Sequence, residues 1–283
     1  MTATRRRCAL LAVLVLLTGL VVATPAQAAP GPIRVMTFNI CGNVCRKGEV
    51  PKTAGNVAYQ VVARRVGVTF LQEVCYSQFL AIRKRLLRRG YHGVFAASTS
   101  GGKCDDHDRK HGSGFGNAIL VRGPVSGRVV RRLPIPSPVR AEARTLLGTS
   151  ARLGGRWVFL ATTHTAPSGP NLSAQLAAVR ANLAPMARRR PVILGGDLNS
   201  LPESPALDDF YSARVPDGRG VFREMHETAG ALPCRCGSPT FRTTPRKIDY
   251  VFASAAHFRP HGATTIVSRY SDHRMYVGVF GPA

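Results

Sequence analysis

The sequence predicts an α/β domain built as a layered sandwich. Short apolar runs typical of buried strands recur along the chain, and stretches with helical spacing separate some of them. The predicted strands outnumber the predicted helices and alternate with them irregularly. A Rossmann fold would show regular alternation and a glycine-rich phosphate loop, and the sequence contains no such glycine fingerprint. These observations favour layered sheets.

The first predicted strand, residues 33–40, is an apolar run with Asn39 near its end. A helix is predicted over 57–66, and a second buried strand over 68–73 ends in Glu73. An acid closing an apolar strand is unusual, because a carboxylate is rarely buried without a partner. A salt bridge at the sheet edge and a bound ligand are both open explanations.

A second helix is predicted around Phe79, Ile82 and Leu86, with Gly90 as its stop. The opposite face of this helix is basic, with Arg83, Lys84, Arg85, Arg88 and Arg89. Such a face is most often simply solvated, and contact with phosphates is the functional alternative.

The polar segment 104–111 contains three aspartates and two histidines. A hydrated loop is the favoured interpretation, and a structural cation such as Ca²⁺ is the alternative. A further strand is predicted over 116–121.

The stretch 191–200 (PVILGGDLNS) begins as a buried strand and ends in polar residues that include Asp197 and Asn199. We expect its two glycines to let the backbone turn sharply. Period-two alternation would point both polar side chains the same way. An acid and an amide so placed can hold a water or a metal beside a phosphate oxygen, although these residue types also suit an ordinary turn.

The strand predicted over 156–164 ends in His164. Asn171 is expected to cap the helix that follows, because an amide oxygen can accept from the free N–H groups of a first turn. The apolar face of that helix comprises Leu172, Leu176, Val179 and Leu183.

The strand predicted over 246–252 carries Asp249. The pair Asp272 and His273 directly precedes a last predicted strand over 275–280.

Residues 1–28 are expected to form a secretory signal peptide. Three arginines at 5–7 form its basic region, residues 9–23 its apolar region, and 26–28 its Ala-x-Ala cleavage site. The apolar run is short for a membrane span. We therefore expect a secreted protein with one domain over residues 29–283.

Removal of this segment leaves 36 basic and 15 acidic residues, a formal charge of +21. Such an excess favours a polyanionic partner: nucleic acid, an anionic membrane surface or a cell-wall polymer. The alternative is compositional, because most of the charge is arginine, as a GC-rich coding sequence would produce.

Six cysteines remain outside the predicted signal, and an even number in a secreted chain indicates disulfides. A metal cluster is the weaker alternative. Fifteen pairings are open among Cys41, Cys45, Cys75, Cys104, Cys234 and Cys236.

Polar side chains thus recur at the predicted strand ends. Each alone has a structural explanation, but together they offer oxygen ligands for a hard cation, which favours Mg²⁺ or Mn²⁺ over Zn²⁺. The set comprises Asn39, Glu73, His164, Asp197, Asn199, Asp249, Asp272 and His273.

Seven short segments carry a family resemblance: Phe38-Asn39, Gln72-Glu73, GNAIL at 116–120, Thr163-His164, GDLNS at 196–200, IDYVF at 248–252 and Ser-Asp-His at 271–273. In this order they resemble the endonuclease/exonuclease/phosphatase superfamily, which includes the pancreatic-type DNase, apurinic endonucleases, neutral sphingomyelinases and inositol polyphosphate 5-phosphatases. The segments span nearly all of residues 29–283. The combination of Gly-Asp-x-Asn with a late Ser-Asp-His is specific, whereas Phe-Asn alone is weak.

The resemblance implies a DNase I-like, four-layer αββα sandwich with two mainly antiparallel sheets and one cleft at their end. It also implies a role for each matched residue. Metal ligands would be Asn39, Glu73 and Asp272, and phosphate would contact Asn117, Arg144 and Asn199.

In the implied reaction, Asp197 orients or deprotonates the attacking water. His273, paired with Asp249, binds the phosphate and assists the attack, and His164 acts on the phosphate or the leaving oxygen. A His–Asp pair suits this task because it fixes the imidazole tautomer and favours the charged form. Removal of either histidine should cost activity without unfolding the protein.

The segment 164–168 (HTAPS) is similar to the corresponding segment of secreted DNases, and the basic charge also favours nucleic acid. One departure stands at 139–146, where nuclease members often carry an aromatic residue and this chain has Ala143 and Arg144. We expect a secreted, monomeric, Mg²⁺-dependent nuclease that acts on DNA, with RNA as a second substrate and no stable membrane association. The alternatives are a sphingomyelinase-like or phosphomonoester hydrolase and a non-catalytic basic binding protein.

Overall fold

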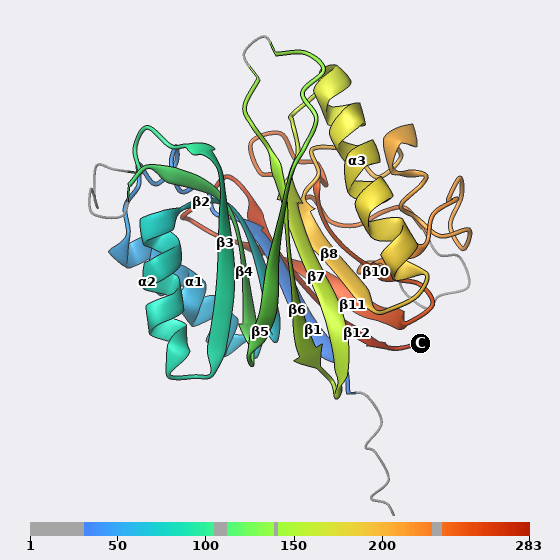
Figure 1. Ribbon diagram of the computed structural model, residues 1–283, viewed down its shortest axis with the longest axis horizontal. Coiled ribbons are helices and arrows are strands. Elements are labelled where there is room, and N and C mark those ends of the chain that lie inside the picture. Colours follow the sequence, from blue (N-terminus) through green and yellow to red (C-terminus); the bar gives the residue numbers. More distant parts are fainter. Residues whose placement is uncertain (1–30, 105–111, 139–140, 228–233) are drawn as a thin grey trace, which may run out of the picture.

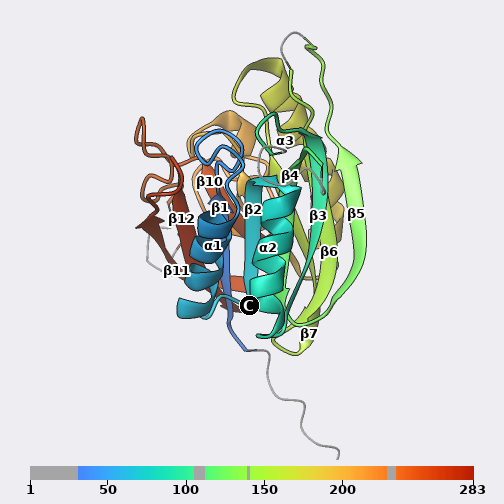
Figure 2. The same ribbon diagram turned by 90° about the vertical axis from the view of Figure 1, so that its left-hand side faces the viewer.

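A computed structural model describes residues 31–104, 112–138, 141–227 and 234–283. Two six-stranded sheets stand face to face at the centre of the molecule (Figure 1). Helices α1 and α2 cover the outer face of one sheet, and α3 covers the other. Figure 2 looks onto α1 and α2, with the strands behind them. The expected αββα sandwich is therefore confirmed.

The first sheet has the strand order β11-β12-β1-β2-β4-β3. Only its central pair, β1 and β2, is parallel, and its other pairs are antiparallel. Its strands are β1 (Ile33–Asn39), β2 (Val68–Cys75), β3 (Tyr91–Ser100), β4 (Gly114–Arg122), β11 (Phe258–Val267) and β12 (Arg274–Pro282).

The second sheet has the order β5-β6-β7-β8-β10-β9. Again one central pair, β7 and β8, is parallel and the other pairs are antiparallel. Its strands are β5 (Val125–Arg132), β6 (Thr145–Leu153), β7 (Arg156–His164), β8 (Val192–Asp197), β9 (Phe222–Glu224) and β10 (Asp249–Ser254).

Three buried apolar clusters hold these layers together. Between the sheets, Phe70 packs in one cluster with Leu160 and Val251. A second cluster joins α1 (Pro51–Ala63) and α2 (Tyr76–Leu87) to the first sheet, and a third joins α3 (Gly169–Ala187) to the second sheet. Each fully buried large apolar side chain contributes about 1.5–3 kcal/mol.

Helix α1 begins earlier than its sequence predicts, at Pro51 and not at residue 57. The Glu49 side chain explains the difference, because it accepts from the backbone N–H groups of Lys52 at 2.7 Å and Thr53 at 3.0 Å. Two of the free N–H groups in the first turn are thereby satisfied.

Helix α3 corrects a second expectation. It begins at Gly169, so Asn171 lies within its first turn and is not the cap. The Asn171 amide instead bonds both backbone groups of Ser137, accepting at 2.9 Å and donating at 2.7 Å. The helix thereby anchors the connection that follows β5.

The role expected for Gly195 and Gly196 is also wrong. Both lie inside β8 and neither has a positive φ, so the backbone does not turn there. A Cβ on Gly195 would overlap the Phe70 ring of the facing sheet, and one on Gly196 would overlap the Thr163 carbonyl. The glycines therefore serve close packing, and the turn falls at Asn199, whose φ is +47°.

Three cysteine pairs form disulfides: Cys41–Cys45, Cys75–Cys104 and Cys234–Cys236. The strand predicted over 246–252 begins only at Asp249. The predicted signal peptide and residues 105–111 of the predicted polar loop lie outside the described residues. Among the described helices, none has the length and apolarity needed to cross a membrane.

Candidate active site

The two parallel strand pairs end at the same edge of the sandwich, and this brings the predicted residues together. Asn39 closes β1, and Glu73 lies near the end of β2. In the other sheet, Asp197 is the register partner of both His164 on β7 and Asp249 on β10. Carboxylates and imidazoles from both sheets thus face one another across the sandwich.

Asn39 is the link between the two sheets. Its buried amide nitrogen donates to Glu73 Oε1 at 2.9 Å and to Asp197 Oδ2 at 3.1 Å. Its amide oxygen accepts from the backbone N–H of Cys41 at 3.0 Å. Both N–H groups of this side chain are therefore used to fix the two acids relative to each other, and its oxygen, which has two lone pairs, can still bind a cation.

Glu73 sits on a kink in β2. Its φ is +54°, and the pairing of β2 with β4 shifts register between Leu71 and Val74. Such a bulge re-aims a side chain at a strand end, and strain of this kind concentrates at functional sites. Gly42 packs against the kink and donates its N–H to the Glu73 carbonyl at 2.9 Å. Burial raises the pKa of Glu73, so this carboxylate gains from a nearby cation.

His273 forms a buried pair with Asp249, with Nδ1 2.9 Å from the carboxylate. Its other nitrogen, Nε2, lies 3.6 Å from Asp197 Oδ2. Burial alone would lower the pKa of His273, but the negative charges of Asp249 and Asp197 outweigh it and raise the pKa to about 10. The imidazole is therefore held as a cation that can donate a proton or a hydrogen bond.

His164 is held in the opposite state. Arg144 approaches its Nδ1 at 2.7 Å, and a guanidinium can only donate, so Nδ1 must accept. The ring proton then sits on Nε2, 3.4 Å from Asp197 Oδ2. Burial, followed by the charges of Arg144 and His273, lowers the pKa of His164 well below its ordinary value. His164 is therefore a neutral donor.

Asp197 lies at the centre of the group. Burial is the main cause that raises its pKa to about 7, and the Asp249 charge adds to it. The His273 cation and the hydrogen bond from Asn39 oppose that rise. A carboxylate poised near neutrality is suited to accept a proton from water.

The remaining predicted residues surround this group. Asn199 forms the turn after β8, and its side chain donates to the Thr165 backbone carbonyl at 3.0 Å. Asn117 donates to the Thr145 carbonyl at 3.1 Å, and its own carbonyl oxygen has no partner in the described part of the chain. Both amides thus use one N–H on the backbone, and their phosphate-binding role stays a prediction.

Two groups of side chains could hold a cation here. Asp197, Asp249 and His273 offer ligand atoms within 4.8 Å of one another. In that group, however, His273 is cationic and already bonded to Asp249, which makes it a poor ligand. The oxygen donors Asn39, Glu73 and Asp272 suit a hard divalent ion better, because the Glu73 carboxylate is largely buried and accepts only one hydrogen bond from the described residues.

Several supporting residues escaped the sequence analysis. The Ser271 hydroxyl donates to the backbone carbonyl of Asn39 at 2.8 Å and accepts from the backbone N–H of His273 at 3.0 Å. The Thr240 hydroxyl accepts from the Asp249 backbone at 3.0 Å, and the Phe241 ring packs edge-on against His273 at 5.0 Å. Ser271 lies within a matched segment and could have been inferred, whereas nothing in the sequence marks Thr240 or Phe241.

Comparison with known families yields one match that covers most of the chain. The model of the endonuclease/exonuclease/phosphatase family matches residues 36–273. A search of curated protein sequences found no match.

Solved structures share the fold at low sequence identity. The human nocturnin catalytic domain with bound sulfate is 20% identical, with 91% of this chain and 96% of that chain covered and a TM-score of 0.69. An endonuclease/exonuclease/phosphatase protein from Beutenbergia cavernae is 23% identical, with 89% of this chain and 72% of that chain covered and a TM-score of 0.65. A mannosyl-6-phosphatase from Bacteroides thetaiotaomicron is 17% identical, with 89% and 99% covered and a TM-score of 0.65.

Proposed function

Since the chain belongs to the endonuclease/exonuclease/phosphatase family, and is therefore a phosphoester hydrolase, we propose that it is a divalent-metal-dependent nuclease that cleaves DNA, with RNA as a second substrate. The observation that carries the proposal is the double hydrogen bond of Asn39 to Glu73 and Asp197. It ties a metal-ligand carboxylate from one sheet to a candidate base from the other.

The residues present suit the chemistry of phosphodiester hydrolysis. A divalent ion bound by Asn39, Glu73 and Asp272 would neutralise charge on the phosphoryl oxygens. Asp197 would orient the attacking water and take its proton. The site thus separates metal binding from proton transfer.

Two histidines in different charge states complete the site. The cationic His273 would donate to a phosphoryl oxygen whose charge grows in the transition state. The neutral His164 would offer its Nε2–H to the phosphate or the leaving oxygen, and Arg144 would add a fixed positive charge beside it. Together these donors act where negative charge develops.

The net charge supports nucleic acid as the substrate. The chain carries 39 basic and 15 acidic residues, and strong basicity favours association with a polyanion. We also propose that the protein is secreted, on the basis of its N-terminal 28 residues, and that it acts as a monomer without stable membrane association. Mass spectrometry of the protein from culture medium should find Ala29 as its first residue.

A panel assay tests the proposed substrate. Purified protein would be incubated with supercoiled plasmid, RNA, sphingomyelin vesicles and mannose 6-phosphate, each with Mg²⁺ or Mn²⁺ and again with excess chelator. We expect cleavage of plasmid and RNA that the chelator abolishes. Release of phosphocholine or inorganic phosphate with both nucleic acids intact would replace the nuclease proposal by one of the other hydrolases.

A further inference from the structure

Three hollows lie next to one another at the end of the first sheet opposite the candidate active site. The first has a volume of about 510 Å³ and is lined by Arg34 and Arg64, and the second, of about 620 Å³, by Arg34, Arg65 and Arg122. The third, of about 330 Å³, is lined by Arg65, Arg89 and Arg122. Neighbouring hollows share these arginines and therefore lie side by side, and we call the three together the basal trough.

The basal trough is remote from the reacting groups. Arg34 precedes Asn39 by five residues on β1, which corresponds to about 17 Å along an extended strand. A molecule bound in the trough would therefore not block the candidate active site. A long, flexible or extended polymer could occupy both.

The charge of the basal trough is not neutralised by the residues that the structure describes. Among the described residues, none of its five arginines forms an ion pair with a carboxylate. Glu73, at the other end, is the one acidic residue in α1, α2 and the six strands of the first sheet. Like charges this close repel within a Debye length of about 8–10 Å. An anionic partner would remove that repulsion.

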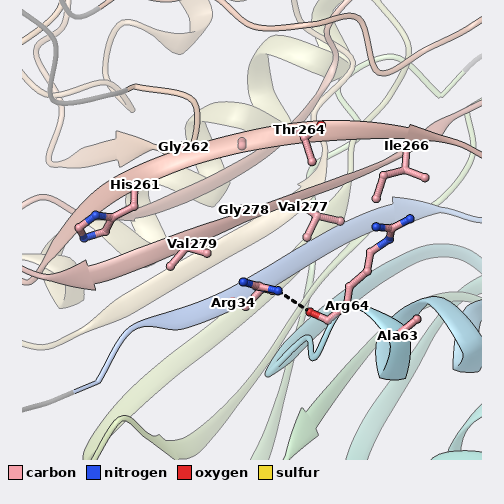
Figure 3. A pocket seen from close by; sticks show the side chains of 11 residues that line it. Arg34, Ala63, Arg64, His261, Gly262, Thr264, Ile266, Val277, Gly278 and Val279 are labelled. Carbon is pink, nitrogen blue, oxygen red and sulfur yellow. Dashed lines mark hydrogen bonds between the residues drawn. The ribbon is translucent and has the colours of Figure 1, made fainter.

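Two of these arginines are held in place by the fold. Arg34 donates to the backbone carbonyl of Arg64 at 2.9 Å, just past the last turn of α1 (Figure 3). Arg64 donates through Nε to Gln60 at 2.9 Å. Each keeps further N–H groups for a ligand, and fixing a side chain in advance lowers the entropy cost of binding. The trough is therefore partly preorganised.

The walls of the basal trough favour a backbone ligand over a flat surface. Ala63, Gly262 and Gly278 leave room in its floor, and the figure shows the Arg34 and Arg64 side chains between α1 and β11 (Figure 3). A concave groove surrounds a narrow strand of phosphates but cannot follow a planar membrane. Its lining also contains no exposed Phe, Tyr or Trp ring on which a base would stack.

We propose that the basal trough binds the sugar-phosphate backbone of a nucleic acid, without sequence preference, at a second site away from the point of cleavage. This extends the proposed function, because a polymer held at the trough stays near the active site between cuts. The binding itself depends only on the arginines and can be measured without any cleavage.

The test compares two triple variants with the same change in net charge. Arg65→Gln/Arg89→Gln/Arg122→Gln removes exposed arginines of the basal trough. Arg188→Gln/Arg189→Gln/Arg214→Gln removes exposed arginines elsewhere. Binding of a fluorescein-labelled 30-base-pair duplex is measured by anisotropy in excess chelator from low to high salt. Loss of three phosphate contacts should reduce the slope of log K against log salt by up to about 2.7.

We expect the trough variant to lose at least tenfold in affinity at 0.1 M salt and the control variant less than threefold. Equal losses in the two variants, or none in the trough variant, would overturn the proposal. The variant Arg65→Lys/Arg89→Lys/Arg122→Lys keeps the charge and should bind the duplex as the wild type does. It therefore distinguishes a loss of binding caused by lost charge from one caused by misfolding. If the trough variant still bound the duplex but no longer sedimented with phosphatidylglycerol vesicles as the wild type does, the trough would be assigned to a lipid surface instead.

Failure of the nuclease proposal would look different. In that case the panel assay would show no cleavage of nucleic acid, while duplex binding in chelator would still depend on the basal trough. If cleavage is present, the trough variant should hydrolyse bis(4-nitrophenyl) phosphate, a substrate too small to reach the trough, at the wild-type rate.

Discussion

Two histidines at opposite ends of the sandwich, His273 and His257, have pKa values shifted in opposite directions. At the catalytic end, the negative charges of Asp249 and Asp197 overcome burial and raise the pKa of His273 to about 10. At the opposite end, burial and the neighbouring Arg156 lower the pKa of His257. Both histidines lie beside strands of the same two sheets, so the difference comes from the charges around them.

The contrast shows how this fold separates stability from chemistry. The middle of the sandwich is apolar and common to both ends. Acids and imidazoles at or beside the ends of five strands meet at the catalytic end, whereas the arginines of the basal trough form no ion pair with a carboxylate in the described part of the chain. Changes at one end should therefore leave the properties of the other end intact.

The largest effect is expected from Asp197→Asn. The variant keeps the shape of the side chain but removes the candidate base, so hydrolysis should fall by about 10²–10⁴-fold. Initial rates on plasmid with saturating Mg²⁺ measure this, and the exposed Asp217→Asn is the matched control. Duplex binding at the basal trough should not change. A loss of less than tenfold would remove Asp197 from the chemistry.

A smaller loss is expected from Asp249→Asn. Without the carboxylate 2.9 Å from Nδ1, the pKa of His273 should fall below about 10, and loss of such an orienting partner typically costs about 10–100-fold in activity. Titration of the His273 ring by NMR checks the pKa directly. An unchanged pKa would show that Asp249 does not hold the charge of His273.

Gly195→Ala tests the middle of the sandwich. The new methyl group would overlap the Phe70 ring, and overpacking of a core usually costs about 1–3 kcal/mol in the free energy of unfolding. Urea denaturation measures it. Gly55→Ala in α1 is the control, because nothing lies within 4 Å of the added carbon, and it should stabilise the helix by about 0.5–1 kcal/mol. If the Gly195→Ala variant were as stable as the wild type, β8 would not require a glycine at this position.

The smallest effect is expected at His257. Its folded pKa lies below the unfolded value, so the neutral ring contributes stability above about pH 6.5 that is lost as the pH falls through the folded pKa. His257→Gln should therefore flatten the decline in the free energy of unfolding between pH 7 and pH 5. The exposed His92→Gln is the matched control. If the free energy of unfolding of the His257 variant declined more steeply than that of the wild type, the folded pKa of His257 would not lie below the unfolded value.

Most of the fold, and the residues that come together at the candidate site, could be predicted from the sequence, whereas the role of each residue stays a prediction. The strands carry continuous apolar runs, and the seven matched segments place Asn39, Glu73, His164, Asp197 and His273 at strand ends, where the structure has them. Helix boundaries were less predictable, since the start of α1 depends on Glu49, which lies outside the periodic pattern.

Long-range contacts set the rest. The packing role of Gly195 could not be predicted, because Phe70, which it accommodates, is on the facing sheet. The neutral state of His164 comes first from burial and then from the charge of Arg144, twenty residues away along the chain. The basal trough combines arginines from two strand ends and two helix ends, and no spacing in the sequence links them.

The central claim is that a divalent ion binds at Glu73 of the first sheet, beside the candidate base Asp197 of the second. The most direct test is an anomalous difference map from crystals grown with Mn²⁺. The account predicts a peak within coordination distance of a Glu73 carboxylate oxygen, and no such peak in Glu73→Gln crystals. A protein that hydrolyses phosphodiesters with Mn²⁺ bound elsewhere and Glu73 unliganded would contradict it.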